Sequence, residues 1–468
     1  MDYGWLSLIP AILAVILAFI TRDAIISLAI GCLAGVLLMG EGLAGFPELL
    51  MRALGTRDFI WICLIELFIG ILVAFFQRSG AVQMFTQRAR SLVNSRKQTQ
   101  ILGWGLGMFI FFSDYFSPLF VGPVMRNITD RARISREKLA YICDSTSAPM
   151  TVLAPITGWA VYISGLLIGI GPILDRKIAM STFVKAIPFN FYAILTIIMV
   201  GLIALRWIPE FGPMHRAEQR ALKTGQVLRK GAVSMMSTEL TDLPVSKSGR
   251  PNIWLNLFIP VLIVITINTV SFITTGQARV LRSFMLAVTI SGIIMLFQRI
   301  DNLHGLMKTS LSGIKGVMPA VLILAFAFAI NAVSREMGTA KYVVEMTKSW
   351  LNPIFLPFMV FLISAFISFA TGTAWGTYAI MIVMAVPLSF EFTQGQVTFL
   401  VFATIGAVAG GGVFGDHCSP LSDTTVLSSL GSACDHMDHV RTQLPYALVT
   451  AVVASILYII LGIIAVQT

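Results

Sequence analysis

The sequence predicts an all-α polytopic membrane protein made of two inverted repeats. Only 12% of the 468 residues are charged and 56% are hydrophobic, whereas soluble domains carry about 25% charged residues. The hydrophobic residues form runs of about 20, the length that crosses about 30 Å of hydrocarbon. Six runs precede a polar segment and six follow it in matching order, so the chain is expected to contain two related halves.

The first half, residues 1–206, is expected to hold three plain spans, a hairpin, a broken helix and a last plain span. Its runs lie near 6–20, 24–40, 59–77, 101–125, 139–171 and 180–205. Ser113 and Asp114 interrupt the fourth run, which we interpret as a re-entrant hairpin. A polar segment at 144–149, which ends in Pro149, interrupts the fifth run.

The second half, residues 251–468, repeats this order after a linker at 207–250. Its runs lie near 252–273, 283–298, 317–334, 353–388, 397–429 and 446–466. A Thr-Gly-Thr sequence at 371–373 interrupts the fourth run, and an Asp-His-Cys-Ser-Pro sequence at 416–420 interrupts the fifth. The hairpin is therefore expected at 353–388 and the broken helix at 397–429.

The inverted arrangement follows from the number of crossings. If neither hairpin crosses the membrane, each half crosses five times, and the second half is inserted upside down, as in many secondary transporters. This topology puts most lysines and arginines on the cytoplasmic side, together with the linker, and both termini outside. The net charge of +10 then reflects membrane topology, and nucleic acid is not an expected partner; the lipid bilayer is.

Each broken helix is expected to hold a cation. Pro149 and Pro420 free backbone carbonyls, and such groups are tolerated at membrane depth only where they are buried in protein or line a cavity. Oxygen-rich sites suit hard cations, and an intramembrane aspartate is costly unless it is paired, protonated or cation-bound. Sodium is therefore expected at Asp144, Ser147, Asp416 and Ser419. The alternative is a proline kink beside a buried, hydrogen-bonded aspartate.

The hairpin tips are expected to face the same site, because helix ends carry partial charges that attract ions. The alternative is an ordinary membrane helix with a polar kink. Asp423 either faces the cavity or caps the helix that resumes there. The expected ion or substrate ligands are Ser113, Asp114, Asp144, Thr146, Ser147, Thr371, Gly372, Thr373, Asp416, Ser419, Ser422 and Asp423. The expected proton-coupling residues are Asp144, Asp416, Glu66 and His417.

No cofactor beyond Na⁺ and H⁺ is expected. The Cys-Asp-His-Met-Asp-His sequence at 434–439 does not have the spacing of a zinc site, and we interpret it as a loop that caps and orients the final helix. No nucleotide-binding motif is present, which disfavours ATP-driven transport. Ser419 near His417 is poor evidence for a nucleophile and its base, so an enzyme is not expected.

Three segments resemble the NhaC family of sodium/proton antiporters. They are GDHCSPLSDTTVLSS at 415–429, CDHMDHVRTQLPY at 434–446 and FATGTAWGT at 369–377. The resemblance implies the layout of the wider ion transporter superfamily, with a scaffold domain, a transport domain, an elevator motion and a homodimer. It also implies that Asp416, Ser419 and Thr373 are ligands, with Asp144, Ser147 and Asp114 as their partners from the first half.

The sequence therefore predicts a sodium-linked secondary transporter in a bacterial cytoplasmic membrane. Sodium/proton antiport is the first expectation. The NhaC family also resembles malate/lactate exchangers and amino-acid carriers, so the alternative is Na⁺- or H⁺-coupled transport of a small organic solute, either an amino acid or a carboxylate such as malate or lactate.

Overall fold

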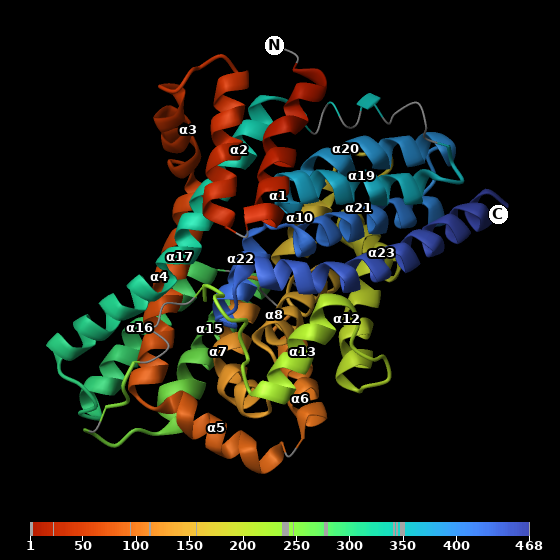
Figure 1. Ribbon diagram of the computed structural model, residues 1–468. Helices are drawn as coiled ribbons and strands as arrows, with labels where there is room; N and C mark the ends of the chain where they lie inside the picture. Colours follow the sequence, from red (N-terminus) through yellow and green to blue (C-terminus); the bar gives the residue numbers. More distant parts are fainter. Residues whose placement is uncertain are drawn as a thin grey trace.

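A computed structural model describes most of the chain as helices (Figure 1). The described residues are 3–21, 23–93, 95–111, 114–155, 157–235, 243–246, 248–275, 279–339, 342, 345–346 and 352–467. Within these ranges no β-strand forms beyond an isolated bridge between Ile170 and Ile173. The expectation of an all-helical polytopic protein is confirmed.

The helices of the first half and the linker follow the chain in this order: η1 (Gly4–Leu8), α1 (Ile9–Thr21), α2 (Ala24–Leu38), α3 (Gly45–Leu54), α4 (Arg57–Arg78), α5 (Ala81–Leu92), α6 (Arg96–Phe109), α7 (Phe116–Arg131), α8 (Arg136–Ser145), α9 (Ala148–Leu153), α10 (Gly158–Leu167), α11 (Arg176–Ala186), η2 (Ile187–Phe189), α12 (Phe191–Ala204) and α13 (Gly212–Thr224). Those of the second half are η3 (Trp254–Phe258), α15 (Ile259–Thr275), α16 (Val280–Phe297), α17 (Leu303–Glu336), α19 (Leu356–Thr371), α20 (Ala374–Phe392), α21 (Phe399–Cys418), α22 (Asp423–Gly431) and α23 (His436–Gln467).

Many of these helices begin at a side-chain cap. A short polar side chain before the helix accepts a hydrogen bond from a backbone N–H of the first turn, which has no partner inside the helix. The caps of this kind are Asp23, Thr56, Ser95, Ser135, Thr157, Asp175, Asn190, Asn302 and Ser422. Beyond the caps most membrane helices are apolar, and a helix pairs its own backbone groups where no water can.

Six helices are long and apolar enough to cross a membrane, or up to nine spans if three bent helix pairs each count as one, among the residues that the structure describes. Both expected hairpin runs contain two helices, α6 and α7 in the first and α19 and α20 in the second, and a short turn joins α19 to α20. Both expected broken runs are interrupted, between α8 and α9 and between α21 and α22. The chain is therefore a multi-pass membrane protein.

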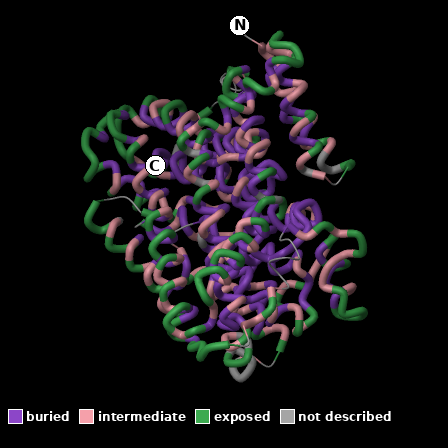
Figure 2. The backbone as a smooth tube through the Cα atoms, turned by 90° about the vertical axis from the view of Figure 1, so that its left-hand side faces the viewer, coloured by how far each residue is buried: buried purple, intermediate pink, exposed green. Residues whose placement is uncertain are grey.

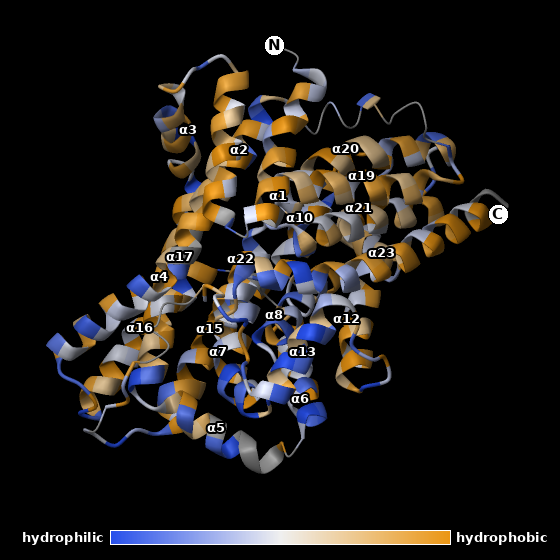
Figure 3. Ribbon diagram, viewed as in Figure 1, coloured by the Kyte–Doolittle hydropathy of each residue, from blue (hydrophilic) through white to orange (hydrophobic). Residues whose placement is uncertain are grey.

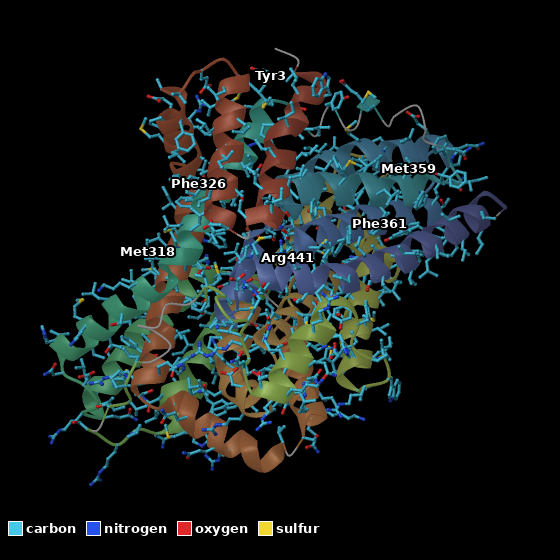
Figure 4. The ribbon with its side chains drawn as sticks, in the orientation of Figure 1. Tyr3, Met318, Phe326, Met359, Phe361 and Arg441 are labelled. Atoms are coloured by element: carbon cyan, nitrogen blue, oxygen red, sulfur yellow. The ribbon has the colours of Figure 1, made fainter. Side chains whose placement is uncertain are left out.

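Several elements differ from the sequence-based expectation. The helices α3, α5 and α13 lie outside the hydrophobic runs, because a helix on the surface does not need an apolar stretch. The long α17 begins well before its run and bends by 43° between Met318 and Val321; Met318 and Phe326 mark its two arms in Figure 4. The loop expected at 434–439 is wrong from His436 onward, where α23 already begins.

The membrane helices form two groups that meet near the middle of the molecule. The first helix group consists of α1 to α4 and α15 to α17, and the second of α6 to α10, α12 and α19 to α23 (Figure 1). Buried residues gather toward the middle (Figure 2). In the first group α4 and α17 cross at Gly70 and Gly313, where a Cβ on Gly70 would lie 2.5 Å from the Gly313 carbonyl oxygen. Only glycine allows this approach of the two backbones.

The first part of the linker is attached to the second helix group by ion pairs. Arg220 pairs with Glu137 on α8 at 2.9 Å, and Arg229 pairs with Asp438 on α23 at 2.8 Å. Figure 3 shows that hydrophilic residues gather around α13, while α1, α2, α17 and α23 are largely hydrophobic. This part of the linker therefore connects the polar beginnings of two membrane helices.

The last part of the linker is attached to the first helix group instead. The Ser246 amide donates to the Arg78 carbonyl at the end of α4 (2.9 Å), and the Arg78 side chain pairs with Asp301 before α17 (2.8 Å). The linker therefore contacts both helix groups on the same hydrophilic side.

Candidate functional site

The first break separates α8 from α9 and satisfies part of its own backbone. The Ser147 hydroxyl donates to the Asp144 carbonyl at 2.8 Å, and the Thr146 hydroxyl donates to the Ile142 carbonyl at 2.7 Å. Ser147 has a non-helical backbone conformation, and Pro149 lies in the first turn of α9, where its missing N–H costs no helical bond. The hydroxyl oxygens of Thr146 and Ser147 keep lone pairs that could accept a further bond.

The Asp144 carboxylate connects this break to the other half of the chain. Its Oδ1 accepts from the Ser428 hydroxyl on α22 at 3.1 Å, and its Oδ2 accepts from the Gln443 amide on α23 at 2.7 Å. His439 Nε2 lies 3.7 Å from the same Oδ2. Three donors or potential donors from the second half therefore surround a carboxylate of the first half.

The second break separates α21 from α22 and is lined by hydroxyl groups. The Ser422 hydroxyl donates to Asp416 Oδ1 at 2.6 Å, and the Thr425 hydroxyl donates to the Asp416 carbonyl at 3.2 Å. The Ser419 hydroxyl donates to the Phe369 carbonyl at 2.7 Å. The break is therefore held to α19, the first arm of the second hairpin, through Ser419.

Two further aspartates lie beside the breaks, each with a donor from an aromatic side chain. Tyr115 donates its hydroxyl to Asp423 Oδ2 at 2.9 Å, and Trp159 donates its indole N–H to Asp114 Oδ2 at 2.8 Å. Ser422, not Asp423, is the N-cap of α22, so the Asp423 carboxylate is directed toward Tyr115. Ser113 lies outside the described residues.

The four aspartates form one electrostatic cluster. The charges of Asp114, Asp144 and Asp423 all act on Asp416. Among the described residues no lysine or arginine forms an ion pair with any of the four, and His439 is the basic side chain nearest to Asp144. Ionised carboxylates taken out of water cost several kcal/mol each unless they are compensated. The cluster therefore requires cations or protons.

Three buried histidines connect the two breaks. His417 on α21 lies between the Ser145 hydroxyl (2.9 Å from Nε2) and the Tyr192 hydroxyl (2.8 Å from Nδ1). The Ser429 hydroxyl lies 3.1 Å from His436 Nδ1 and 2.9 Å from His439 Nδ1. The Ser429 hydroxyl also lies 2.8 Å from the Thr425 carbonyl. Because a hydroxyl has one proton to donate, the two imidazoles and this carbonyl compete for it.

The partners of Gln443 determine one tautomer. Its amide nitrogen donates to the Asp144 carboxylate and to the His417 carbonyl, and neither partner can donate in return. Its Oε1 therefore faces His439 Nε2, at 2.9 Å, as an acceptor. His439 must carry a proton on Nε2, which is an assignment from the bonding pattern.

Each hairpin tip packs against the break of its own half. A Cβ on Gly107, near the end of α6, would meet the Thr146 side chain. Gly372 has a φ of +69°, and a Cβ there would lie 2.6 Å from the Leu421 carbonyl oxygen. Thr371 donates its hydroxyl to the Ile367 carbonyl, and the Thr373 side chain makes no capping bond.

An aromatic wall stands beside the second tip. The rings of Trp159 and Trp375 are stacked with centroids 3.9 Å apart, and the Tyr162 hydroxyl donates to the Trp375 carbonyl at 3.0 Å. Tyr162 and Trp375 are half-buried, as are Thr371 and Thr373. An aromatic and hydroxyl surface of this kind can contact an organic molecule as well as water.

The structure thus brings together most of the expected ligands and adds others that sequence reasoning missed. One region contains the hydroxyl groups of the two breaks together with Asp114, Asp144, Asp416, Asp423 and His417. Glu66 on α4 makes no hydrogen bond to this region. The missed side chains are Tyr115, Tyr192, Ser428 and Gln443. A signal existed for Gln443, because His436, His439 and Gln443 recur at a helical spacing and lie on one face of α23.

Known proteins similar to this chain are antiporters where their names state a function. The profile of the Na⁺/H⁺ antiporter family matches residues 150–463. An uncharacterised protein of Haemophilus influenzae is 34% identical over 97% of this chain and 90% of its own length. A malate-2H⁺/Na⁺-lactate antiporter of Bacillus subtilis is 31% identical over 32% of this chain and 31% of its own length. An uncharacterised Na⁺/H⁺ antiporter of Haemophilus influenzae is 29% identical over 31% of this chain and 30% of its own length.

Proposed function

Because the chain belongs to the Na⁺/H⁺ antiporter family, whose members are transporters rather than enzymes, we propose that it exchanges sodium for protons at the aspartate cluster between its two breaks. The observation that carries this proposal is a group of three buried carboxylates, with Asp423 half-buried beside them, and no lysine or arginine in ion-pair contact among the described residues. Such a group needs a cation or protons, and alternate occupancy by the two is the chemistry of an antiporter.

We place sodium at Asp416 and Ser419 of the second break and at Asp144 and Ser147 of the first. In the described part of the chain no three His, Cys, Asp or Glu side chains converge as ligands of one metal ion. A sodium site here would therefore combine a carboxylate with hydroxyl and carbonyl oxygens, the donors that hard cations accept. Further oxygen ligands of these sodium sites would come from Thr146, Ser422, Asp423 and the tip residues 113–114 and 371–373.

The proposed architecture is two inverted repeats, 1–206 and 251–468, with a cytoplasmic linker between them. Two features support it. Each hairpin packs on the break of its own half. The second arm of each hairpin packs against a helix that follows the other break: α7 against α22, directly after the second break, and α20 against α10, which comes after α9. This reciprocal pattern is what a two-fold relation between the halves produces.

The proposed motion is a displacement of the second helix group, as transport domain, against the first helix group, as scaffold. The hairpins, the breaks and the aspartate cluster all belong to the second group, so they would move together. The homodimer and the placement in a bacterial cytoplasmic membrane, with both termini outside, are proposed from the family resemblance and from the distribution of basic residues.

Asp416→Asn tests the sodium site. An asparagine oxygen still accepts from Ser422, so the fold should persist, but the carboxylate charge is lost. We expect Na⁺-dependent flux in proteoliposomes to disappear, together with the stabilisation by NaCl, which for an intact site is about 2.7 kcal/mol at about one hundred times Kd. Asp175→Asn is the matched control, because asparagine caps α11 as well as aspartate does. Sodium-dependent flux of wild-type size in Asp416→Asn would exclude this site.

A second candidate function is exchange of a small organic solute coupled to Na⁺ or H⁺. The half-buried aromatic surface of Tyr162 and Trp375 beside Thr371 and Thr373 favours it. Aromatic faces typically line sites for organic molecules, whereas sodium takes oxygen ligands. Thermal unfolding with Na⁺, Li⁺, amino acids, malate and lactate separates the two functions. A solute that stabilises wild type but not Trp375→Ala would identify the cargo.

A further inference from the structure

Glu66 differs from every aspartate of the cluster in its surroundings. It lies in α4 and is fully buried, and neither carboxylate oxygen has a hydrogen-bond partner in the part of the chain that the structure describes. Each of the four aspartates, by contrast, accepts at least one bond from a hydroxyl, amide or indole group. The five carboxylates therefore divide into four that have donors and one that has none.

The charges around Glu66 do not compensate it. Asp423 on α22 is the charged side chain whose field acts on Glu66, and it has the same sign. Cys63, one turn earlier on α4, is the titratable neighbour on its own helix, and Tyr115 already bonds to Asp423. No basic side chain of α16 or α17 forms an ion pair with Glu66 among the described residues, although both helices pack on α4.

An ionised carboxylate in this position has neither donors nor a counter-charge. Burying a lone ion costs far more than burying a neutral polar group without a partner, for which the cost is about 1–3 kcal/mol. A proton on Glu66 removes the charge. A sodium ion would need several oxygen ligands in addition to the carboxylate, and the other oxygens of the site are at the breaks. The surroundings of Glu66 therefore suit a proton better than a metal ion.

The backbone of Glu66 is held in the first helix group. One turn after it, Gly70 meets Gly313 in the close crossing of α4 and α17, where neither position has room for a Cβ. Asp423, in contrast, begins α22, a helix of the second group. Glu66 and the aspartate cluster are thus attached to different helix groups.

We propose that Glu66 carries the proton of the exchange, on the scaffold side, while sodium occupies the aspartate cluster. This inference rests on the proposed function and changes it in one respect: it assigns the exchanged proton to Glu66, a separate residue, and leaves sodium at the aspartate cluster. The proton arrives from water, neutralises the Glu66 carboxylate, and returns to water on the other side when the two helix groups change their relative position. Sodium at the aspartates adds positive charge near Glu66 and favours release of that proton.

The test compares Glu66→Gln with Glu66→Asp in proteoliposomes. Glutamine keeps the shape of a neutral Glu66 but has no proton to exchange. We expect Glu66→Gln to lose Na⁺-driven proton movement while it keeps ²²Na⁺/Na⁺ exchange and stabilisation by NaCl, and its sodium exchange should no longer depend on pH. Glu66→Asp should retain proton coupling with a shifted pH profile. Glu391→Gln, at an exposed carboxylate at the end of α20, is the control and should match wild type.

Two outcomes would overturn the inference. One is proton-coupled flux of wild-type size in Glu66→Gln; the other is an equal loss of proton coupling and of ²²Na⁺/Na⁺ exchange in a variant that still folds. Infrared spectroscopy gives a readout that needs no transport: the carbonyl band of protonated carboxylic acids should be present in wild type at neutral pH and weaker in Glu66→Gln by the contribution of one group. Absence of antiport in wild type with this difference present would contradict the proposed function and not the protonated Glu66.

Discussion

At the scale of single residues, the site depends on side chains whose hydrogen-bonding capacity is fully used. Gln443 is the clearest case, because both protons of its amide nitrogen go to acceptors, Asp144 and the His417 carbonyl, and its oxygen accepts from His439. One amide thus orients a carboxylate of the first break and an imidazole of α23. Its loss would leave Asp144 Oδ2 and His439 Nε2 without a hydrogen bond in the interior, whereas the His417 carbonyl keeps the bond from the Thr425 hydroxyl.

Gln443→Leu is therefore expected to destabilise the protein, by about 1–3 kcal/mol for each buried group left without a partner. The measurement is the midpoint of thermal unfolding in detergent. Gln77→Leu is the comparison, because Gln77 is also a buried glutamine but its amide nitrogen has no partner, and removing such a group is nearly neutral. If both variants unfold at the same temperature, the bonds of Gln443 contribute nothing specific.

The sequence indicated where the breaks lie but not what their residues contact. Asp-x-x-Ser and proline predict an oxygen-rich interruption because local chemistry is enough to predict it. The partners of Asp144 are Ser428 and Gln443, almost three hundred residues later, and no local pattern encodes such a pairing. Glu66 was foreseen as a functional residue because a carboxylate in an apolar run is unusual, whereas its lack of any donor is a property of the packed structure alone.

At the scale of helices and turns, the hydrophobic runs predicted the membrane elements well, but they did not predict the amphipathic and polar helices. The α13 helix has too many charged residues to form an apolar run, and the first turns of α23 are polar yet buried, because Asp144 and Ser429 satisfy their histidines. Hydropathy measures the average preference of a segment for lipid. It therefore cannot detect polar helices that are paired inside the protein.

The turn of the second hairpin gives a prediction at this scale. Gly372→Ala places a Cβ where φ is +69°, a conformation that costs non-glycine residues about 1–2 kcal/mol, and also drives it into the Leu421 carbonyl. Gly395→Ala has the same backbone cost at φ +79° but nothing within 4 Å. We expect a larger fall in the thermal midpoint for Gly372→Ala, and reduced Na⁺ flux only in that variant. Equal effects would show that the tip does not depend on its contact with the second break.

At the scale of the whole molecule, the two helix groups and the linker define how the parts could move. The linker contacts the second group through Arg220 and Arg229 and the first group through Ser246 and Arg78. Both contacts lie on the side of the molecule that is rich in hydrophilic residues (Figure 3). The linker is therefore attached to both of the groups that are proposed to move relative to each other.

The proposed sidedness of the protein, which rests on the proposed five crossings in each half, can be tested with single cysteines. Leu174, between α10 and α11, should lie outside, and Val233, in the linker, should lie in the cytoplasm. Both side chains are 75% exposed, so their intrinsic reactivity is comparable. Four of the five native cysteines are buried and Cys63 is half-buried, so the unmodified protein serves as the background control.

In intact cells a membrane-impermeant maleimide should label Leu174→Cys and not Val233→Cys, and in inside-out vesicles the order should reverse. Labelling of both positions from the same side would require an even number of crossings between them. Because both hairpins lie outside residues 174–233, that result would remove the α11–α12 crossing. The first half would then cross an even number of times, and the halves would no longer be inverted. The reciprocal packing of hairpin tips and breaks would in that case need an explanation other than a two-fold relation in the membrane plane.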